Sequence, residues 1–354
     1  MPPVEDAPRV LLMACARNEA PYLPEWIAWH RLIGVQQILV YTNDCSDGTV
    51  RMLQRMQQLG LATHAFNTGL TRDGAQMPPQ QRALRHVRKH PLYAEAEWFL
   101  HIDIDEFLVI HAGDGRIAGL LAEVPEADVI PIAWKLFGPD GRFHLGRRLL
   151  TEGLVDCEGP SHAESPPRTF KALTRLSDQL NRYGVHRPGF RAEARRSIRW
   201  RTPAGRAVDH LADGGYALAG EVGDAVAQLN HYALRTYTAF LGKQARGSSA
   251  RPGRAFDAEY AARHIGTGTT DLALWHERRR LRTARDDILA DPTLAALWQK
   301  ARSIHAMRTR SALRRKEGLT LLAEVHRLDR PQGGLKRRLR QWFAKARGAG
   351  GRPG

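Results

Sequence analysis

Strand-length apolar runs occur in the first 110 residues, at 10–16, 37–41, 61–66 and 98–102. Between them lie segments whose apolar residues recur at helical spacing, at 25–32, 47–59 and 80–87. Strands that alternate with helices usually pair in parallel through right-handed crossovers. The pattern therefore predicts an α/β domain with a mostly parallel sheet, helices on both faces, and ligands beyond the carboxyl ends of the strands.

The pattern changes after about residue 127. Short strands are expected at 129–136, 170–176 and 227–233, separated by loops rich in glycine and proline, and 156–167 is a surface loop by composition. From Arg235 onward the spacing is helical. We therefore predict a main domain over 8–250, a helical extension over 251–330 and a basic, amphipathic or disordered tail over 331–354.

Composition limits the classes of protein that fit this pattern. The chain has 354 residues, and 43% of them are hydrophobic, which is enough for a full core. No apolar run approaches the roughly 20 residues of a membrane-spanning helix, and the acidic N-terminus lacks the apolar segment of a secretory signal. Three cysteines without CxxC spacing argue against a disulfide framework or a zinc site, and Cys15 is expected in the core. We expect a cytoplasmic protein.

The net charge of +16 is concentrated at the C-terminus. Residues 301–354 hold 15 Lys/Arg and 3 Asp/Glu, which leaves the first 300 residues at only +4. A protein that binds DNA or RNA is expected to carry its basic excess on the folded core as well. We therefore expect no nucleic-acid partner, although the tail keeps a nucleic-acid-binding protein among the alternatives.

Three carboxylates follow the apolar run 98–102, and they form the most informative segment of the chain. Asp103 and Asp105 are separated by one residue, so continued strand alternation would place them on one side. Two such carboxylates repel each other unless a cation lies nearby, and oxygen ligands at a strand end suit Mg²⁺ or Mn²⁺. The alternative is an acidic cluster that only caps a strand end.

Polar residues also follow the first two predicted strands. Arg17, Asn18 and Glu19 come after the first strand, which is a usual position for ligand contacts in such sheets. An arginine there could pair with a phosphate, and an asparagine could form hydrogen bonds with the edge of a base. Asn43 and Asp44 come after the second, at the start of a helix whose N–H groups attract a ligand. The alternatives are a solvated loop with a local Arg–Glu pair and a helix N-cap at Ser46 or Asp47.

These segments together resemble a known family of enzymes. The segment 16–34 resembles the start of family 2-type glycosyltransferases of the GT-A fold, in the branch that shares motifs with family 92 glycosyltransferases. The other motifs of that branch follow in order, at 42–49, 103–107, 134–138, Lys171, 186–188 and 230–247. One departure is Asn43, where many family 2 enzymes carry aspartate, and it leaves the nucleobase open.

The resemblance implies a role for each matching residue. The donor would be a UDP- or GDP-sugar, and the acceptor a hydroxyl on a saccharide, lipid or protein. Asp105 would bind Mn²⁺ or Mg²⁺ with help from His231, and Asp103 would contact ribose or metal-bound water. The donor contacts would be Arg17, Asn18, Glu19, Asn43, Asp44 and Asp103.

Four further residues are candidates for other roles. Asp140 is the candidate general base, while Glu106 is expected to position the metal or to pack behind it. Lys243, with Arg246 one turn later, could face a diphosphate, but a solvated helix face is the favoured explanation. The enzymatic alternative is a metal-dependent nucleotidyltransferase, which usually carries a glycine-rich loop after its first strand; here that loop is Arg-Asn-Glu-Ala-Pro.

The basic tail itself carries an amphipathic pattern. On a helix over 335–347, Leu335, Leu339, Trp342, Phe343 and Ala346 form one apolar stripe, and basic residues cover much of the remaining surface. This pattern is typical of a helix that lies on an anionic membrane surface. The alternative is that the stripe packs on the enzyme or on a second subunit.

We predict that the tail retains the protein on anionic vesicles at low salt. Each cation near an anionic leaflet contributes about 1 kcal/mol, so binding should weaken as salt rises. Co-sedimentation with vesicles of varied anionic lipid content should pellet the full chain but not a chain that ends at Arg330. If both chains stay in the supernatant at low salt, the membrane contact is wrong.

Overall fold

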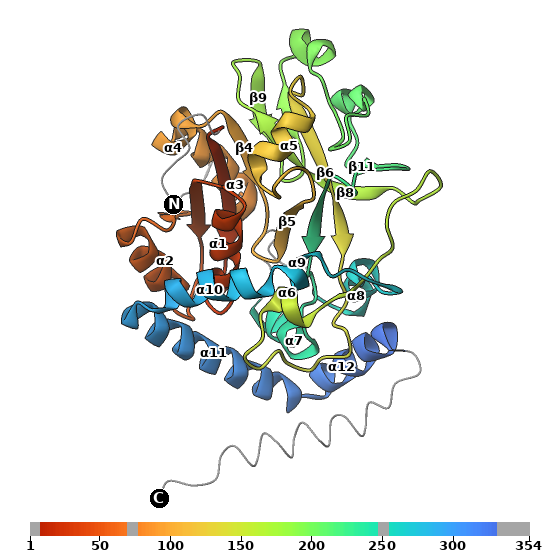
Figure 1. Ribbon diagram of the computed structural model, residues 1–354. Helices are drawn as coiled ribbons and strands as arrows, with labels where there is room; N and C mark the ends of the chain where they lie inside the picture. The colour runs from red at the N-terminus through yellow and green to blue at the C-terminus, as the bar shows by residue number, and fades with distance from the viewer. Residues whose placement is uncertain (1–7, 69–76, 247–254, 331–354) are drawn as a thin grey trace, which may run out of the picture.

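The computed structural model describes residues 8–68, 77–246 and 255–330 and forms one layered α/β assembly (Figure 1). Its main sheet has nine strands in the order β3-β2-β1-β4-β8-β6-β12-β5, and β11 pairs with β8. The strands are β1 (Val10–Ala16), β2 (Gln37–Thr42), β3 (Thr63–Phe66), β4 (Trp98–His101), β5 (Glu106–Ile110), β6 (Val129–Leu136), β8 (Arg168–Arg175), β11 (Ala217–Leu218) and β12 (Ala227–His231). Two small sheets pair β9 (Leu180–Tyr183) with β10 (Pro188–Phe190) and β7 (Asp156–Cys157) with β13 (Thr269–Thr270).

The main sheet is mixed, which differs from the mostly parallel sheet that we expected. The first four strands pair in parallel, as does β6 with β12. By contrast, β8 runs antiparallel to both β4 and β6, and β5 runs antiparallel to β12. The strand–helix alternation stops after β4, so nothing in the later chain forces a parallel crossover.

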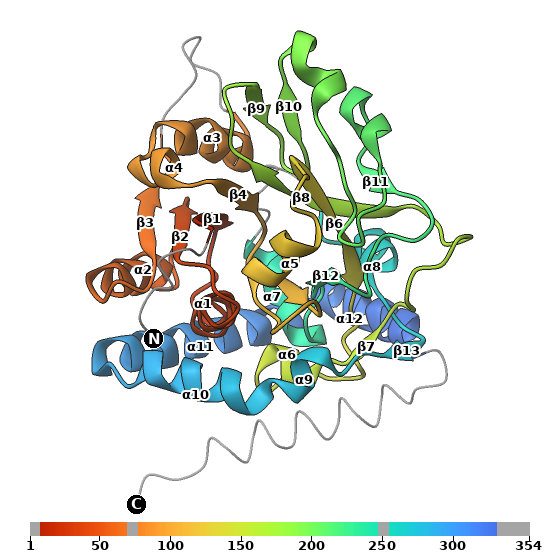
Figure 2. The ribbon, with the colours of Figure 1, turned by 45° about the horizontal axis from the view of Figure 1, so that its top comes forward.

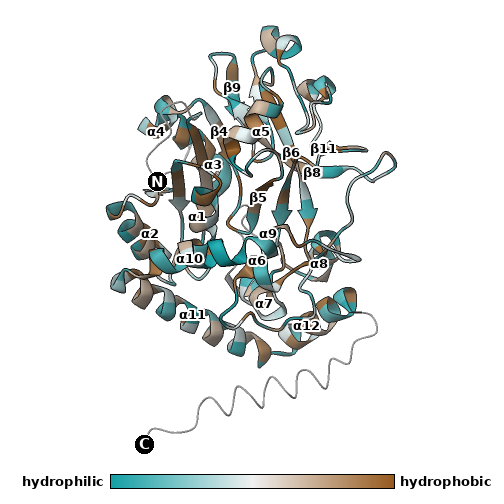
Figure 3. Cartoon of the chain, in the orientation of Figure 1, coloured by the Kyte–Doolittle hydropathy of each residue, from teal (hydrophilic) through white to brown (hydrophobic). Residues whose placement is uncertain are grey.

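Alternation along β1 explains why helices cover both faces of the sheet. Val10, Leu12 and Ala14 pack with α1 (Leu23–Leu32) and α2 (Thr49–Gln58), whereas Leu11 and Met13 pack with α3 (Pro79–His86) on the other face. Figure 2 shows these helices on the two sides of the strands, and Figure 3 shows the hydrophobic colours gathered in the strands. Since both faces are covered, β1 is apolar throughout rather than alternating.

The remaining helices fall into three groups along the chain. Short ones lie beside the first strands and after β5, namely η1 (Val87–Lys89), α4 (Pro91–Glu95), α5 (Ile117–Glu123) and α6 (Leu150–Gly153). Two 3₁₀ turns, η2 (Ala192–Ser197) and η3 (Asp209–Asp213), precede β11. The C-terminal set is α7 (Tyr237–Arg246), α8 (Ala258–His264), α9 (Ala273–His276), α10 (Arg278–Leu289), α11 (Pro292–Leu313) and α12 (Lys316–Asp329).

The C-terminal helices pack directly on the sheet domain. Leu281, Ile288, Leu294 and Ala301 belong to the same buried cluster as the strands β1 and β2. In Figure 1, α10 and α11 run side by side below the strands, and α7 lies between them and α12. The helical segment that we predicted as an extension therefore covers the edge of the sheet where β1 and β2 end.

The predicted elements agree best where periodicity is strong. The strands expected at 10–16 and 129–136 have those bounds, and α1, α2 and α3 begin and end within two residues of the expected positions. Strand β4 ends at His101, so the Asp pair lies in the turn before β5 rather than on a continuing strand. The small strands β7 and β13 were missed because two-residue strands carry no period.

The other global expectations have mixed outcomes. All three cysteines are free, and Cys15 is buried as expected. Among the described residues no helix is both long and apolar enough to cross a membrane. The amphipathic segment 335–347 and the terminal residues 348–354 lie outside the described residues.

Side chains of α1 satisfy the backbone of β5, the last strand of the sheet. Trp26 Nε1 donates to the Glu106 carbonyl at 2.8 Å, and Trp29 Nε1 donates to the Leu108 carbonyl at 2.7 Å. The Leu108 N–H donates to His30 Nε2 at 3.4 Å. Glu106 and Leu108 direct their backbone groups away from β12, so the α1 side chains replace a missing neighbouring strand. The tryptophans of the 16–34 motif thus hold the strand that follows the Asp pair.

We predict that Trp29→Phe lowers the free energy of unfolding by about 1–3 kcal/mol, because the buried Leu108 carbonyl loses its donor. Urea unfolding followed by circular dichroism measures this change. Trp275→Phe is the matched control, since Trp275 is half-buried and no hydrogen bond of its ring nitrogen is described. Equal effects of the two substitutions would contradict this role of Trp29.

Candidate active site

The tight turn between β4 and β5 carries the three carboxylates. Asp105 and Glu106 are buried, and Asp103 is half-buried. Glu106 accepts from the Asp103 N–H at 3.0 Å through Oε2, so it shapes the turn from within. Burial, together with the charges of Asp103 and Asp105, raises the pKa of Glu106 well above its usual range despite Lys171 nearby. This agrees with the expectation that Glu106 supports the site from behind.

Lys171 of β8 provides a buried cation behind the turn. Its ammonium lies 3.4 Å from Asp103 Oδ2 and 3.7 Å from Glu106 Oε2, and its side chain is fully buried. Gln80 of α3 donates to the other oxygen of Asp103 at 2.5 Å. Burial by itself raises the pKa of Asp103, but Lys171 and His101 lower it overall. Asp103 is therefore held as a carboxylate, with both oxygens engaged.

Asp105 faces a different set of partners. Lys243 of α7 lies 2.6 Å from Asp105 Oδ2, and His231 Nε2 lies 3.8 Å from Asp105 Oδ1. Burial opposes the charge, but Lys243, His231 and Arg235 together lower the pKa of Asp105 strongly. Asp103 and Asp105 thus have different partners, and they lie in a turn rather than on the continuing strand that the expected alternation requires.

Lys243 corrects one of our expectations. Its side chain is buried, and its ammonium also donates to the Ala233 carbonyl at 2.8 Å. The solvated helix face that we favoured for it is therefore wrong. The sequence predicted that Lys243 lies on a helix. Only the tertiary structure shows that α7 packs over the turn, so that Lys243 contacts Asp105 instead of solvent. The side chain of Arg246 lies outside the described residues.

His231 reaches Asp105 through strand pairing. His231 is opposite Glu106 in the antiparallel register of β12 and β5, and the Tyr232 N–H donates to the Asp105 carbonyl at 2.8 Å. Burial lowers the pKa of His231 to about 3, so the imidazole is neutral. Its ring packs on Trp134, with centroids 4.3 Å apart, and its Nδ1 is buried without a hydrogen-bond partner. A neutral imidazole beside a carboxylate can bind a divalent metal.

The loops after β1 and β2 are tied to each other. Asn18 Oδ1 accepts from the Ser46 N–H at 2.7 Å, and Asp47 Oδ2 accepts from the Ala20 N–H at 3.3 Å. Thr49 Oγ1 accepts from the Glu19 N–H at 2.9 Å. The N-cap of α2 is Gly48, with φ of 98°, rather than Ser46 or Asp47. Asp47 still accepts from the first helical N–H, that of Thr49, at 3.0 Å.

Two residues at the tips of these loops have left-handed backbones. Asn18 has φ of 56° and Asp44 has φ of 50°, a conformation that asparagine and aspartate tolerate better than most residues. Asn43 donates to Asp44 Oδ2 at 3.0 Å, while Asn43 Oδ1 is buried without a partner. Asp44 itself is exposed. At the carboxyl edge of the sheet the loops therefore hold a buried acceptor without a partner, Asn43 Oδ1, and the exposed carboxylate of Asp44. Residues with strained backbones often mark functional sites.

The segment after β12 also reaches the loop after β1. Arg235, with φ of 56°, places Nη1 2.8 Å from Glu19 Oε2, and both side chains are buried. The Arg235 guanidinium stacks on the Tyr22 ring at 3.6 Å. Glu19 is thus held by Arg235, and Arg235 is a residue to which motif reading gave no role.

Asp140 lies in a different environment from the other candidates. It follows β6 with φ of 51°, and its carboxylate accepts from Arg330 at 2.7 Å at the end of α12. Burial raises the pKa of Asp140, although Arg142 and Arg330 oppose this effect. No described contact joins Asp140 to Asp103, Asp105 or His231.

The residues present suit a metal that shares its coordination with a substrate. Among the described residues, no three or more His, Cys, Asp or Glu side chains converge as a metal cage. Mg²⁺ and Mn²⁺ commonly use one or two protein ligands together with substrate phosphates. Asp105 and His231 offer an ionised oxygen and a neutral nitrogen in adjacent positions, so they fit such a site. Asp103 has other partners, Gln80 and Lys171.

The first part of this chain is similar to glycosyltransferases. More specifically, residues 14–139 match the sequence profile of glycosyltransferase family 92. A family 92 protein of Oryza sativa subsp. japonica is 31% identical over 169 residues, which are 47% of this chain and 26% of the rice protein. A second, from Ricinus communis, is 24% identical over 144 residues, which are 37% and 23% of the two chains. The chain thus spans about a quarter of the length of these curated relatives.

Solved structures add little to this comparison. TarS 1–349 of S. aureus in complex with UDP is 16% identical, with 45% of this chain and 40% of that chain covered and a TM-score of 0.27. A TM-score this low supports no argument about fold or function. The sequence similarity over residues 14–139 therefore stands on its own.

We predict that Lys171→Met lowers the free energy of unfolding by about 3 kcal/mol, because Asp103 loses its buried cation. In an Asp103→Asn background the same substitution should cost clearly less, since no charge is left unpaired. Urea unfolding of the four proteins measures the coupling, and Lys300→Met, at an exposed position, is the control. Equal losses in both backgrounds would mean that Lys171 acts through packing alone.

Proposed function

We propose that the protein is a glycosyltransferase with a GT-A-like domain that moves a sugar from a nucleotide-sugar to an acceptor hydroxyl. The observation that carries this proposal is the family 92 similarity over residues 14–139. The matched region contains Asn18, Asn43, Asp44, Asp103 and Asp105, which come from the ends of three neighbouring parallel strands. Ligands of such sheets bind at this edge.

Donor binding is proposed at the two tied loops. The unpartnered Asn43 Oδ1 would accept an N–H of the nucleobase, and uracil and guanine both carry an N–H beside a carbonyl. Asp44, which is exposed, would accept from ribose hydroxyls. Asn18, Arg17 and Glu19 would form the wall of the same pocket. A UDP- or GDP-sugar is the proposed donor.

A divalent metal, Mn²⁺ or Mg²⁺, is proposed at Asp105 and His231. When bound, the metal would neutralise charge on the diphosphate leaving group. Lys243 would add a fixed positive charge beside Asp105, in a site from which water is largely excluded. Asp103 would act mainly by holding the turn, through its bonds to Lys171 and Gln80.

The proposed transfer balances without a redox partner. An acceptor hydroxyl oxygen forms a bond to the anomeric carbon of the sugar, while the bond from that carbon to the diphosphate oxygen breaks. The nucleoside diphosphate leaves with the electron pair, and the hydroxyl proton passes to a base. Asp140 stays the proposed base; its ion pair with Arg330 would have to open for this role.

The acceptor is proposed to be a saccharide, with a lipid or protein hydroxyl as the other possibilities. We also propose a cytoplasmic location, with the basic tail at the inner face of a membrane. It rests on the sequence of residues 335–347.

The test is release of UDP, GDP, CDP or dTDP from a panel of nucleotide-sugars, with Mn²⁺, with Mg²⁺ or with EDTA. We expect one diphosphate to be released in a metal-dependent reaction. Asp105→Asn should lower the rate at least a hundredfold, because the substitution removes an ionised oxygen at the diphosphate. His231→Ala should raise the Mn²⁺ concentration needed by at least tenfold.

The control variant is Asp114→Asn, which changes an exposed carboxylate paired with Arg116 and should leave the rate unchanged. Circular dichroism checks that each variant folds. If no donor is turned over, or if Asp105→Asn keeps most of the activity, the proposed function fails. Release of pyrophosphate from a nucleoside triphosphate and a sugar phosphate would instead indicate a nucleotidyltransferase.

A further inference from the structure

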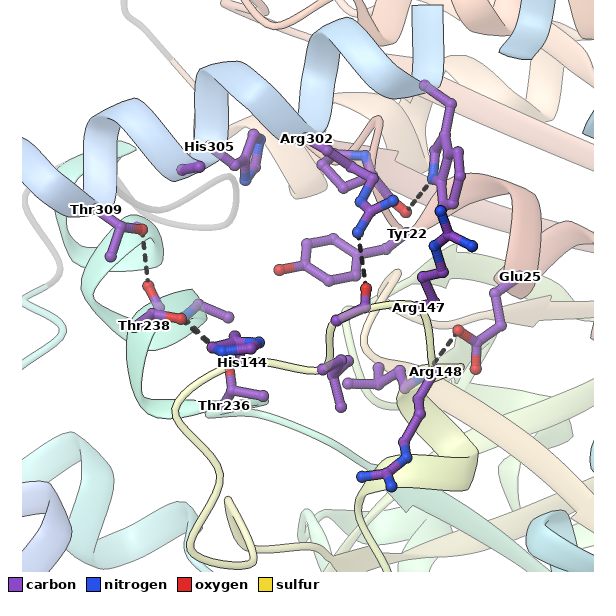
Figure 4. A pocket seen from close by; sticks show the side chains of 18 of the residues that line it. Tyr22, Glu25, His144, Arg147, Arg148, Thr236, Thr238, Arg302, His305 and Thr309 are labelled. Atoms are coloured by element: carbon purple, nitrogen blue, oxygen red, sulfur yellow. Dashed lines mark hydrogen bonds between the residues drawn. The ribbon is translucent and has the colours of Figure 1, made fainter. Parts of the chain in front are cut away.

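A cavity of about 460 Å³ lies beside α7, the helix whose Lys243 pairs with Asp105. It opens between the start of α1, the loop before α6, and the helices α7, α10 and α11. Figure 4 shows the Tyr22 ring and the Arg302 side chain extending into it from opposite elements. Neither Asp103 nor Asp105 lines this cavity, so it is separate from the candidate active site.

Two arginines of the lining lie near the ring of Trp298, and Arg147 is a third cation of the same lining. The guanidinium of Arg302 lies 4.6 Å from the Trp298 ring centre, and that of Arg285 lies 5.8 Å from it. Burial, together with the charges of Arg285 and Arg147, lowers the pKa of Arg302. The three guanidinium groups are therefore close enough to repel one another, and an anion bound between them would relieve this repulsion.

Acidic groups around the cavity offset this charge only in part. Among the described residues no carboxylate forms an ion pair with Arg147 or Arg302, and the described side-chain hydrogen bond of Arg302 goes to the Gly146 carbonyl at 2.7 Å. Arg285 pairs with its neighbour Asp286, whose side chain is 56% exposed. Glu25 also lines the cavity, but its carboxylate accepts from the N–H groups of Leu150 and Thr151 at 2.7 and 3.0 Å.

The cavity shares a wall with the candidate active site. Tyr22, which lines the cavity, stacks on Arg235, and Arg235 pairs with Glu19 of the proposed donor loop. On α7, Gly242 lines the cavity and the next residue, Lys243, holds Asp105. A molecule bound here would be a neighbour of the proposed donor rather than a competitor for its place.

We propose that this cavity binds the acceptor, and that the acceptor is a saccharide carrying a phosphate or carboxylate group. Guanidinium groups recognise both kinds of anion through paired N–H donors. The aromatic rings of Trp298 and Tyr22 offer flat apolar surface for the carbon face of a sugar ring. The volume lies within the range of pockets that enclose small ligands. This inference rests on the proposed glycosyltransferase function, because it names the acceptor class of that reaction.

Isothermal titration calorimetry of the full-length protein, without any donor, tests the binding. The probes are glucose 6-phosphate, glucuronic acid, neutral glucose and pyrophosphate. We expect at least one of the two anionic sugars to bind at least tenfold more tightly than glucose and than pyrophosphate. Arg302→Gln and Arg147→Gln should each weaken that binding about tenfold or more. Arg147 lies on an exposed loop, so its variant keeps the test valid if Arg302→Gln fails to fold.

The matched control is Arg279→Gln, an exposed arginine of α10 outside the cavity, which should leave the affinity unchanged. The proposal is overturned if pyrophosphate binds as tightly as the sugars, if the arginine variants bind normally, or if UDP and GDP displace the anionic sugar. Since the titration needs no turnover, it separates the two hypotheses. Arginine-dependent sugar binding without release of any nucleoside diphosphate would contradict the enzyme function but keep the site.

Discussion

The structure depends on one turn that brings three carboxyl groups together, with Asp105 and Glu106 buried and Asp103 half-buried. Asp103, Asp105 and Glu106 follow β4 so closely that their charges cannot separate, and removing them from water carries a large free-energy cost unless cations are supplied. Lys171 and Lys243 supply these cations from β8 and α7, elements far away in the sequence. Antiparallel β8 inserts beside β4, and α7 folds back over the turn. The antiparallel position of β8 in the mixed sheet and the position of α7 thus each bring one lysine to the carboxylates.

The two lysines pair with different aspartates, Lys171 with Asp103 and Lys243 with Asp105. Asp103 has both oxygens engaged by Gln80 and Lys171 and serves the architecture of the turn. Asp105 is held ionised, with the neutral imidazole of His231 beside it, and both of these side chains are buried. Two carboxylates at alternate positions therefore have different partners, and the side chain of Asp103 is the more exposed of the two.

The C-terminal helices are part of the site rather than an appendage to it. His305 of α11 lies 2.9 Å from Asp47, and Arg308 donates to Ser46 at 2.8 Å, so α11 holds the loop after β2. Trp298 donates to the Pro21 carbonyl at 2.9 Å and so fixes the chain where α1 begins. Helices added to one edge of the sheet thus hold the loops after β1 and β2 and at the same time line the arginine-rich cavity. Rigid support of this kind keeps binding groups in place before a ligand arrives.

Local patterns in the sequence were enough to locate the first strands, the helices between them and the polar residues at their ends. The prediction of these elements succeeded because a strand that is buried on both faces, such as β1, is a continuous apolar run in the sequence. Parallel strands also bring their carboxyl ends to the same edge of the sheet. The sequence also singled out Lys171 as a member of a motif and His231 as a candidate ligand together with Asp105, but it did not indicate the partners of Lys171. Only the tertiary structure decided that Lys243 is buried on Asp105, that Arg235 holds Glu19 and that Asp140 meets Arg330. Each of these contacts joins residues roughly 140 to 220 positions apart, and a local period carries no information about which distant charge will neutralise a buried one.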